Sequence, residues 1–381
     1  MLKVGIIGLG NTGNQVASLG AERLKIPAIA INSSEKDLDS VPNTIVKKLI
    51  KNKTGDSTGA GKDRTLAKKY LKDSVNDLLM DTDIQEILSK LDVIFVVSST
   101  GGGTGSGTAP IMAQLISSQY VDAKCILVGV LPVNSEALSA HVNTLQYLDE
   151  LYRVLQNQTY MLYDNDKLSG LPSPQLLRKV NEEIISDIDV LRCTYNTKTQ
   201  YDSIDDRDMT RLISFGGRIM VSRLEGFQEK DCDNQTIEDM IISNIKKNCH
   251  VESQRDHKVM ATGIITNLSE SLTSDFDNNI PSVREFVGVP VHSFSHITVN
   301  EDRKMPNNVF FIATGLTPIN DRINKISDRV DEIEEKQKIM EEANALSDVD
   351  LKKLSESVED EEKEVQTEDF NINDVFGRFG L

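Results

Sequence analysis

The stretch Gly101-Gly102-Gly103-Thr104-Gly105-Ser106-Gly107 holds five glycines in seven residues, and it decides the fold class. It follows the apolar run Val93 to Val97, which is typical of a buried strand, and precedes a helix expected from near Ala109. Such a loop points consecutive backbone N–H groups into one concavity, and Thr104, Ser106 and Thr108 add hydroxyl donors, which suits a di- or triphosphate. A flexible linker would not lie between a buried strand and a helix. No Gly-Lys-Ser/Thr follows, which excludes a Walker loop, and no GxSxG register makes Ser106 a nucleophile.

A second glycine-rich turn, Gly8-Leu9-Gly10-Asn11-Thr12-Gly13, follows the strand-like run Val4 to Ile7 and opens a helical pattern. We expect Gly10, Asn11 and Thr12 to approach phosphate oxygens at the N-terminus of that helix. A dinucleotide-binding fold would place an acid after the next strand to hold the ribose, but that strand ends at Asn32. This weakens a nicotinamide-dependent oxidoreductase, which stays open as an alternative.

A third segment, Gly59-Ala60-Gly61-Lys62, could close over the terminal phosphate. Gly61 and Lys62 would then contact the nucleotide, with Lys62 supplying the cation; the alternative is a solvated lysine in a mobile loop. Because the first two loops follow two parallel strands, they imply one crevice that holds one nucleotide from both sides.

The alternation of β-branched runs with amphipathic patterns predicts an α/β fold with a Rossmann-like parallel sheet in the first half. After residue 209, a helix and four strand patterns predict a smaller α/β domain; these patterns cover residues 218–222, 260–266, 290–297 and 309–313. The expected units are a nucleotide-binding domain (1–172), a central helix with an acidic loop (173–208), the smaller α/β domain (209–315), a long helix (316–346) and a flexible acidic tail (347–381).

Composition excludes several classes of protein. The chain has 42 Lys and Arg against 59 Asp and Glu, a formal net charge of −17, so it repels nucleic acid and anionic membranes at long range and would need an adaptor to reach DNA. No apolar run approaches the ~20 residues of a membrane span and no signal peptide is recognisable, so we expect a cytoplasmic protein. The four cysteines form no CxxC pair, which argues against a disulfide framework, a zinc site or any other protein-ligated metal.

The end of the chain combines two patterns. Apolar residues from Ile319 to Met340 recur at heptad spacing, which predicts either a coiled-coil seam or a helix packed on the chain's own body. Residues 356–369 hold eight acids and one lysine, which predicts a solvated tail. The apolar residues from Phe370 to Leu381 then suggest a peptide that docks on a partner; the alternative is an unused terminus.

These motifs carry a family resemblance. Residues 101–107 match the GGGTG(S/T)G signature of the tubulin and FtsZ superfamily, and Gly13-Asn14-Gln15 resembles the tubulin form of the first loop, which makes Asn14 a nucleotide contact. Pro132 to Glu136 resembles the ribose loop of FtsZ, with Glu136 as its ligand, and Asn165-Asp166-Lys167-Leu168 resembles the NDKL segment. The match spans residues 1 to about 315. The long helix and the acidic tail look most like TubZ, the plasmid and phage branch that segregates DNA.

The resemblance implies GTP and GDP as ligands, with Mg²⁺. Guanine offers two N–H donors and one acceptor, which the carboxamides of Asn165 and Asn181 can read; the alternative is that Asn181 pairs within the protein. Residues 203–208 resemble the NxDxxD loop, which enters the nucleotide pocket of the next subunit in a filament, so Asp205 and Asp208 are the expected catalytic acids. Without the resemblance, this segment would be a solvated, helix-capping loop.

The sequence therefore predicts a GTP-dependent, filament-forming GTPase that forms a head-to-tail homopolymer and segregates DNA through an adaptor bound to its C-terminal tail. Alternatives within the superfamily are an FtsZ-like division filament or a phage-positioning filament. A non-hydrolysing scaffold is a further alternative.

Overall fold

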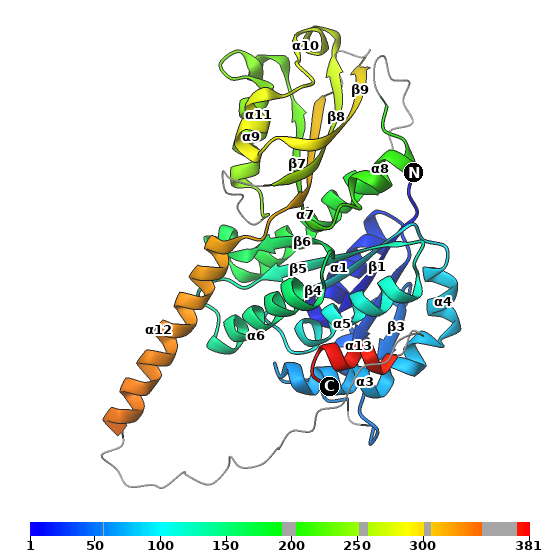
Figure 1. The fold of residues 1–381 in the computed structure, drawn as a ribbon, viewed down its shortest axis with the longest axis vertical. Helices are drawn as coiled ribbons and strands as arrows, with labels where there is room; N and C mark the ends of the chain where they lie inside the picture. Colours follow the sequence, from blue (N-terminus) through cyan, green and yellow to red (C-terminus); the bar gives the residue numbers. More distant parts are fainter. Residues whose placement is uncertain (56, 193–202, 251–257, 301–305, 345–371) are drawn as a thin grey trace.

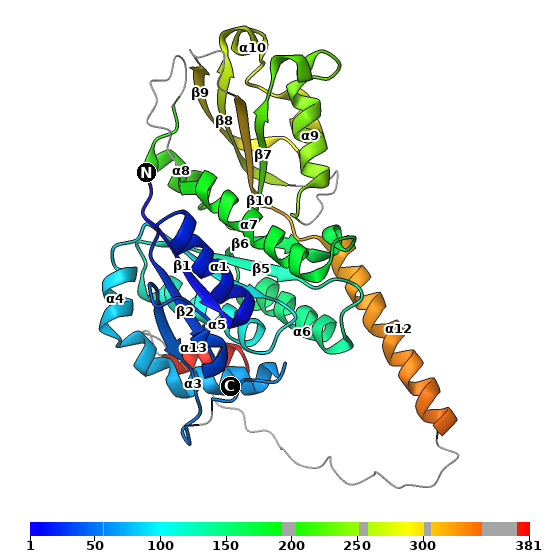
Figure 2. The same cartoon turned by 180° about the vertical axis from the view of Figure 1, so that it is seen from behind.

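A computed structural model describes residues 1–55, 57–192, 203–250, 258–300, 306–344 and 372–381. Two α/β units lie one above the other, and the long helix α7 (Ser173–Arg192) lies between them (Figures 1 and 2). One ten-stranded sheet runs through both units in the order β3-β2-β1-β4-β5-β6-β7-β10-β8-β9. No described helix has the length and apolarity needed to cross a membrane.

The first unit is the expected parallel sheet with helices on both faces. Its strands are β1 (Val4–Leu9), β2 (Ala28–Asn32), β3 (Val46–Leu49), β4 (Val93–Ser99), β5 (Lys124–Leu131) and β6 (Thr159–Asp164), all paired in parallel. Its helical elements are α1 (Gly10–Arg23), α2 (Glu35–Asp39), α3 (Arg64–Leu79), α4 (Thr82–Leu88), α5 (Thr104–Gln119), α6 (Leu138–Asp149), the π-helical turn η1 (Glu150–Val154) and the 3-10 turn η2 (Asn165–Leu168). The strand order 3-2-1-4-5-6 reverses between β1 and β4, and in open α/β sheets ligands bind at this switch point.

Two helices begin earlier than the sequence predicted. Helix α1 starts at Gly10, inside the glycine-rich turn, and α5 starts at Thr104 rather than near Ala109, so the last glycines of the signature are helical. The backbone N–H of Gly107 already donates to the carbonyl of Gly103 at 2.9 Å. Glycine therefore serves close helix packing here as well as loop geometry.

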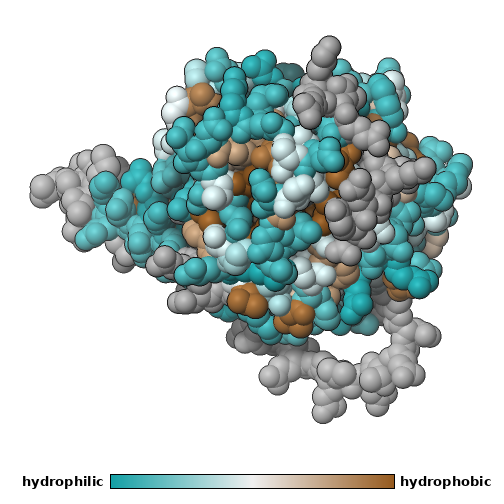
Figure 3. Space-filling model, turned by 90° about the horizontal axis from the view of Figure 1, so that it is seen from above, coloured by the Kyte–Doolittle hydropathy of each residue, from teal (hydrophilic) through white to brown (hydrophobic). Residues whose placement is uncertain are grey.

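The second unit contains the four expected strands, each longer than predicted. They are β7 (Gly217–Phe227), β8 (Val259–Ser269), β9 (Pro290–Asn300) and β10 (Asn307–Leu316), with β10 antiparallel to β7 and β8, and β9 parallel to β8. The helical elements are α8 (Asp206–Leu212), η3 (Glu229–Cys232), α9 (Ile237–Lys247), α10 (Glu270–Asp275) and α11 (Pro281–Val287). Seen from above, this end of the molecule is mainly hydrophilic with separate apolar spots (Figure 3).

The two C-terminal helices lie on the first unit. Helix α12 (Asn320–Asn344) leaves the body beside α6 and projects outward (Figure 1). Its stripe residues Ile326 and Val330 are buried, as is Ile319 just before it, so this part of the stripe packs on the chain's own body. Helix α13 (Ile372–Arg378) lies beside α3 and α5, which corrects the expectation of a free docking peptide. The expected acidic stretch 356–369 lies outside the described residues.

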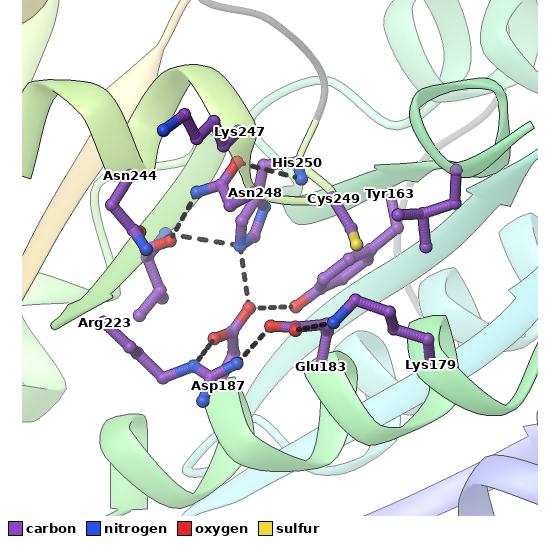
Figure 4. Close-up of a pocket in the computed structure, with 12 residues that line it drawn as sticks. Tyr163, Lys179, Glu183, Asp187, Arg223, Asn244, Lys247, Asn248, Cys249 and His250 are labelled. Carbon is purple, nitrogen blue, oxygen red and sulfur yellow. Dashed lines mark hydrogen bonds and ion pairs between the residues drawn. The ribbon is translucent and has the colours of Figure 1, made fainter. Parts of the chain in front are cut away.

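A buried charge cluster ties α7 to the second unit (Figure 4). Asp187 of α7 accepts hydrogen bonds from Arg223 Nε of β7 at 2.7 Å and from the Tyr163 hydroxyl of β6 at 2.8 Å. His250 Nε2 lies 2.8 Å from the same carboxylate, and Glu183 pairs with Arg223 beside a cavity of about 200 Å³. Burial opposes the charge on Arg223, but the carboxylates of Asp187, Glu183 and Glu225 outweigh it and raise the pKa of its guanidinium.

We expect Arg223→Met to lower the free energy of unfolding by about 3 kcal/mol, because Asp187 would stay buried without its cation. Urea denaturation measures this change. Arg211→Met is the matched control: Arg211 is exposed in the last turn of α8, and its loss should cost less than about 0.5 kcal/mol. A loss as small in Arg223→Met as in the control would contradict the assignment of this cluster as the anchor of α7.

Candidate nucleotide-binding site

A cavity of about 320 Å³ lies at the switch point between β1 and β4. Residues of all three predicted segments line it, as do residues that follow β2. The lining contains Gly10, Asn11, Thr12, Asn32, Ser34, Asp37, Thr58, Gly59, Ala60, Gly61, Lys62, Ser99, Gly102, Gly103, Thr104 and Gly105. The structure thus brings together segments that lie far apart in the sequence.

The two main loops touch backbone to backbone. A Cβ added to Gly13 would lie 2.2 Å from the carbonyl oxygen of Val97, and one on Gly105 would lie 2.6 Å from that of Leu9. Real Cβ atoms do not approach so closely, so only glycine allows the first turns of α1 and α5 to meet. The close contact places the N-termini of both helices at one cavity, where their N–H groups favour an anion.

The third segment is held over the second loop. A Cβ on Gly103 would lie 2.8 Å from the Cα of Lys62, so the two backbones are in contact. Asn143 of α6 fixes this arrangement, because its side-chain amide nitrogen lies 2.9 Å from the carbonyl of Lys62, 3.2 Å from that of Gly101 and 3.0 Å from that of Gly102. The side chain of Lys62 is exposed. Sequence analysis missed Asn143, a polar residue in a mostly apolar helix pattern.

The three expected hydroxyl donors differ in where they lie. The Thr104 hydroxyl lines the cavity and is 2.6 Å from that of Ser33, which links the end of β2 to the start of α5. The other two lie in α5 and are used inside the protein: Ser106 donates to the carbonyl of Asn143 at 3.4 Å, and Thr108 to that of Thr104 at 2.7 Å. Neither lines the cavity, because the helix starts earlier than expected. Gly101 and Gly107 likewise lie outside its lining.

A row of carboxamides leads from the cavity towards α7. Asn181 donates to Gln15 at 3.2 Å, and Gln15 donates to Asn11 at 3.3 Å, so Asn181 has a protein partner, the alternative that the sequence left open. Asn14 is 1% exposed, and among the described residues neither its nitrogen nor its oxygen has a partner; the buried Asn165 oxygen has none there either. Asn14, Asn165 and Asn181 all lie outside the cavity lining, so their contacts with a nucleotide stay predictions. Gln15 was not among the expected contacts.

The expected ribose loop is anchored by α12. Glu136 is half-buried and accepts from the N–H of Val133 at 3.3 Å, outside the cavity lining. Arg322 of α12 donates to the carbonyl of Pro132 at 2.9 Å and lies 2.8 Å from the carboxylate of Asp164 at the end of β6. Burial raises the pKa of Asp164, and the Arg322 cation opposes this shift. No sequence motif indicated Arg322.

The expected catalytic acids lie at the N-terminal ends of the parallel strands, opposite the cavity. Asp205 is exposed and Asp208 is half-buried, and the two form a capping box at the start of α8, as the alternative interpretation expected. The next residue after Asp205, Asp206, lies 2.9 Å from the amino group of Met1, at the N-terminal end of β1 (Figure 1). The six residues of β1 span about 20 Å, so these acids are far from the phosphate loops of their own chain.

Carboxylates are scarce around the cavity itself. Asp37 is the one acid among the described residues that line it, and sequence analysis did not identify it. Among the described residues, no group of three or more His, Cys, Asp or Glu is placed to hold a metal ion.

Comparison with known proteins agrees with this geometry. Residues 3–172 match the model of the Tubulin/FtsZ family GTPase domain. This part of the chain is similar to the GTPase domains of the tubulin/FtsZ family. The match favours the GTPase prediction over the oxidoreductase that the first glycine-rich turn left open.

Relatives and solved structures extend the likeness beyond this domain. The tubulin-like protein CetZ of Pyrococcus horikoshii is 26% identical over 48% of this chain and 50% of its own length, and the cell division protein FtsZ 1 of the same organism is 29% identical over 62% and 60%. The chain thus spans 50–60% of the length of these curated relatives. The TubZ crystal structure from Clostridium botulinum phage c-st aligns with a TM-score of 0.69 at 19% identity over 88% of this chain and 99% of that one. The GTPγS-bound CetZ2 protofilament of Haloferax volcanii gives a TM-score of 0.69 at 18% identity, over 88% and 100%. The chain therefore has the tubulin/FtsZ fold, whereas these likenesses do not distinguish the TubZ, CetZ and FtsZ branches.

We expect Gly103→Val to weaken GTP binding at least tenfold, because the added side chain would displace the backbone of Lys62 from the cavity. Nucleotide titration measures the affinity, and circular dichroism checks the fold. Gly170→Val is the control, since no atom lies within 4 Å of a Cβ added there. If a folded Gly103→Val protein bound GTP as tightly as the control, GTP would not lie between these loops.

Proposed function

We propose that the chain is a GTPase that assembles head to tail into a filament, in which the acidic loop of one subunit completes the nucleotide site of the next. One observation carries this proposal: the phosphate cavity and Asp205 and Asp208 lie at opposite edges of the same sheet. A single chain cannot bring them together. If subunits stacked along the strand direction, the acidic loop of one subunit would lie against the phosphate cavity of the next.

The chemistry required at such a junction fits the residues available. Hydrolysis needs an attacking water held by a carboxylate, and the phosphate loops supply N–H donors and Lys62 but no acid. Asp205 is exposed and Asp208 half-buried at the start of α8, so their loop can reach a neighbouring subunit's pocket. Mg²⁺ would be held by phosphate oxygens, with Asp37 as the carboxylate in the cavity, and would neutralise phosphate charge.

We further propose a TubZ-like role, in which the filament moves plasmid or phage DNA through an adaptor that binds the C-terminal tail. Support comes from the net charge of −17, which disfavours direct DNA contact. The likeness to phage c-st TubZ, which extends over 99% of that chain, also supports this role. An FtsZ-like division filament or a phage-positioning filament is the second candidate, because FtsZ 1 of Pyrococcus horikoshii is 29% identical over 62% of the chain.

The proposed base contacts can be tested by nucleotide selectivity. Asn165→Ala and Asn181→Ala should each reduce the preference for GTP over ATP about tenfold in competition binding, because each removes about one hydrogen bond to guanine. Asn76→Ala, on the exposed face of α3, should leave the preference unchanged. Selectivity that survives both substitutions would place base recognition elsewhere in the chain.

The shared site can be tested with charge-neutral variants. Asp205→Asn and Asp208→Asn keep the oxygen that caps α8 and remove the carboxylate, so GTP affinity should stay within about twofold while turnover falls about 100-fold or more. Asp206→Asn removes one charge from the same loop and should turn over like the parent. Phosphate release at several protein concentrations measures both effects.

A mixing experiment then separates catalysis between subunits from catalysis within one. Asp208→Asn subunits bind GTP, and Gly103→Val subunits carry an intact acidic loop, so the mixture should release phosphate faster than either variant alone. In the parent, turnover per molecule should fall on dilution below the assembly threshold. Turnover that stays constant on dilution would show that each chain completes its own site.

A further inference from the structure

The C-terminal peptide occupies an apolar groove on the first unit. Val375, Phe376 and Phe379 are 5%, 1% and 7% exposed, and they join the hydrophobic cluster formed by residues of α3 and α5. The peptide closes on itself with hydrogen bonds from the N–H groups of Phe379 and Leu381 to the carbonyl of Phe376, at 3.0 and 3.2 Å. Its apolar side chains are thus used within the chain.

Charge and chain length favour the chain's own peptide as the occupant. Helix α3, which contacts the peptide through Lys68, also exposes Lys69 and Lys72, and in the sequence the peptide follows the stretch 356–369 with its eight acids. The 27 residues from 345 to 371 join α12 to α13, so the peptide is covalently tethered to the chain that holds it. A covalent tether makes docking intramolecular, which favours this occupant over a free partner.

A series of polar contacts begins at this peptide. The carbonyl of Phe379 accepts a hydrogen bond from Lys68 Nζ of α3 at 3.2 Å. The same ammonium lies 2.8 Å from one carboxylate oxygen of Glu150, the first residue of the π-helical turn after α6. The other oxygen of Glu150 lies 2.6 Å from the guanidinium of Arg64. Arg64 and Glu150 are both almost fully buried.

The series ends on the glycine-rich signature. Arg64 Nη2 donates to the carbonyl of Ser106 at 3.0 Å, in the first turn of α5. That carbonyl is free to accept because the residue four positions later is Pro110, which has no N–H to donate. The neighbours of Ser106 include Thr104 and Gly105, which line the cavity. The docked peptide is therefore linked, through this series of contacts, to the first turn of α5, which would bind phosphate.

We propose that the groove between α3 and α5 is a regulatory site for the chain's own C-terminal peptide, and that the seated peptide raises the affinity of the cavity for GTP. Lys68 held by Phe379 keeps Glu150 and Arg64 in place, and Arg64 keeps the first turn of α5 ordered before nucleotide arrives. Without the peptide, part of the free energy of GTP binding is used to order the first turn of α5, so the affinity for GTP is lower. The inference rests on the proposed GTP site, and coupling between the two sites is reciprocal.

Amide hydrogen exchange of residues 372–381 in the full chain, without nucleotide, measures docking alone. The parent should protect these amides to the same extent at every protein concentration below assembly. Phe376→Ala should abolish protection, and Arg378→Ala, at an exposed position of the same helix, should preserve it. No protection in the parent would overturn the docking site, and protection that rises with concentration would show that a neighbouring chain's groove is used instead.

GTP titration of the same proteins measures the coupling. Phe376→Ala should weaken GTP binding about five- to tenfold, and an excess of a synthetic peptide of residues 370–381 should restore it. Lys68→Met should weaken GTP binding similarly while the peptide stays protected, because the apolar contacts remain; the control Lys69→Met should change neither. GTP should in turn slow exchange of 372–381 in the parent.

The outcomes separate this inference from the proposed function. If Phe376→Ala loses protection but binds GTP within twofold of the parent, the coupling is overturned and the GTP site stands. If the parent binds no GTP, the proposed function falls and takes the coupling with it. If Lys68→Met binds GTP like Lys69→Met, the polar series is not the route, and the proposal as stated is overturned.

Discussion

Backbone contact between two glycine-rich turns is the constraint on which the rest of the molecule depends. Gly13 lies against the carbonyl of Val97, and Gly105 against that of Leu9, at distances that no Cβ could occupy. The contact fixes α1 beside α5 at the switch point of the sheet, so two helix N-termini share one cavity. A single methyl group at either position would push apart the two halves of the nucleotide site and also the two central strands from which the turns emerge.

Helix α7 connects the cavity to the N-terminal ends of the parallel strands. Its first half contributes Asn181, which reaches Gln15 near the cavity, and its last residue, Arg192, accepts the N–H of Leu2 at the opposite edge. Twenty helical residues span about 30 Å, enough to cross the unit. Asp187 on the same helix carries the anchor of the second unit, so any shift of α7 on nucleotide binding would reach both the acidic loop and the upper sheet.

The sequence predicted the features that leave a local pattern along the chain, and it missed the hydrogen bonds between residues far apart in the sequence. The apolar runs gave the strands, and the glycine clusters gave the cavity, because periodicity and close approach leave local signals. Asn143, Arg64 and Arg322 left none, since each acts on backbone carbonyls and carboxylates from segments more than 30 residues away. The early start of α5 was missed for a related reason, since glycine is on average unfavourable in helices. Here the packing of Gly105 against Leu9 and of Gly107 against Arg64 offsets that unfavourable free energy.

The docked peptide shows why composition alone misjudges an end of a chain. An acidic stretch followed by aromatic residues predicts an exposed recognition peptide, yet burial of Val375, Phe376 and Phe379 gives the peptide a stable place on its own molecule. A partner that recognises the same side chains must compete with a tethered groove, so its apparent affinity is reduced by the fraction of time the peptide is seated. The groove connects through Lys68 to the turn that lines the cavity. The affinity of such a partner for the peptide and the affinity of the cavity for GTP are therefore coupled, and each changes the other by the same factor.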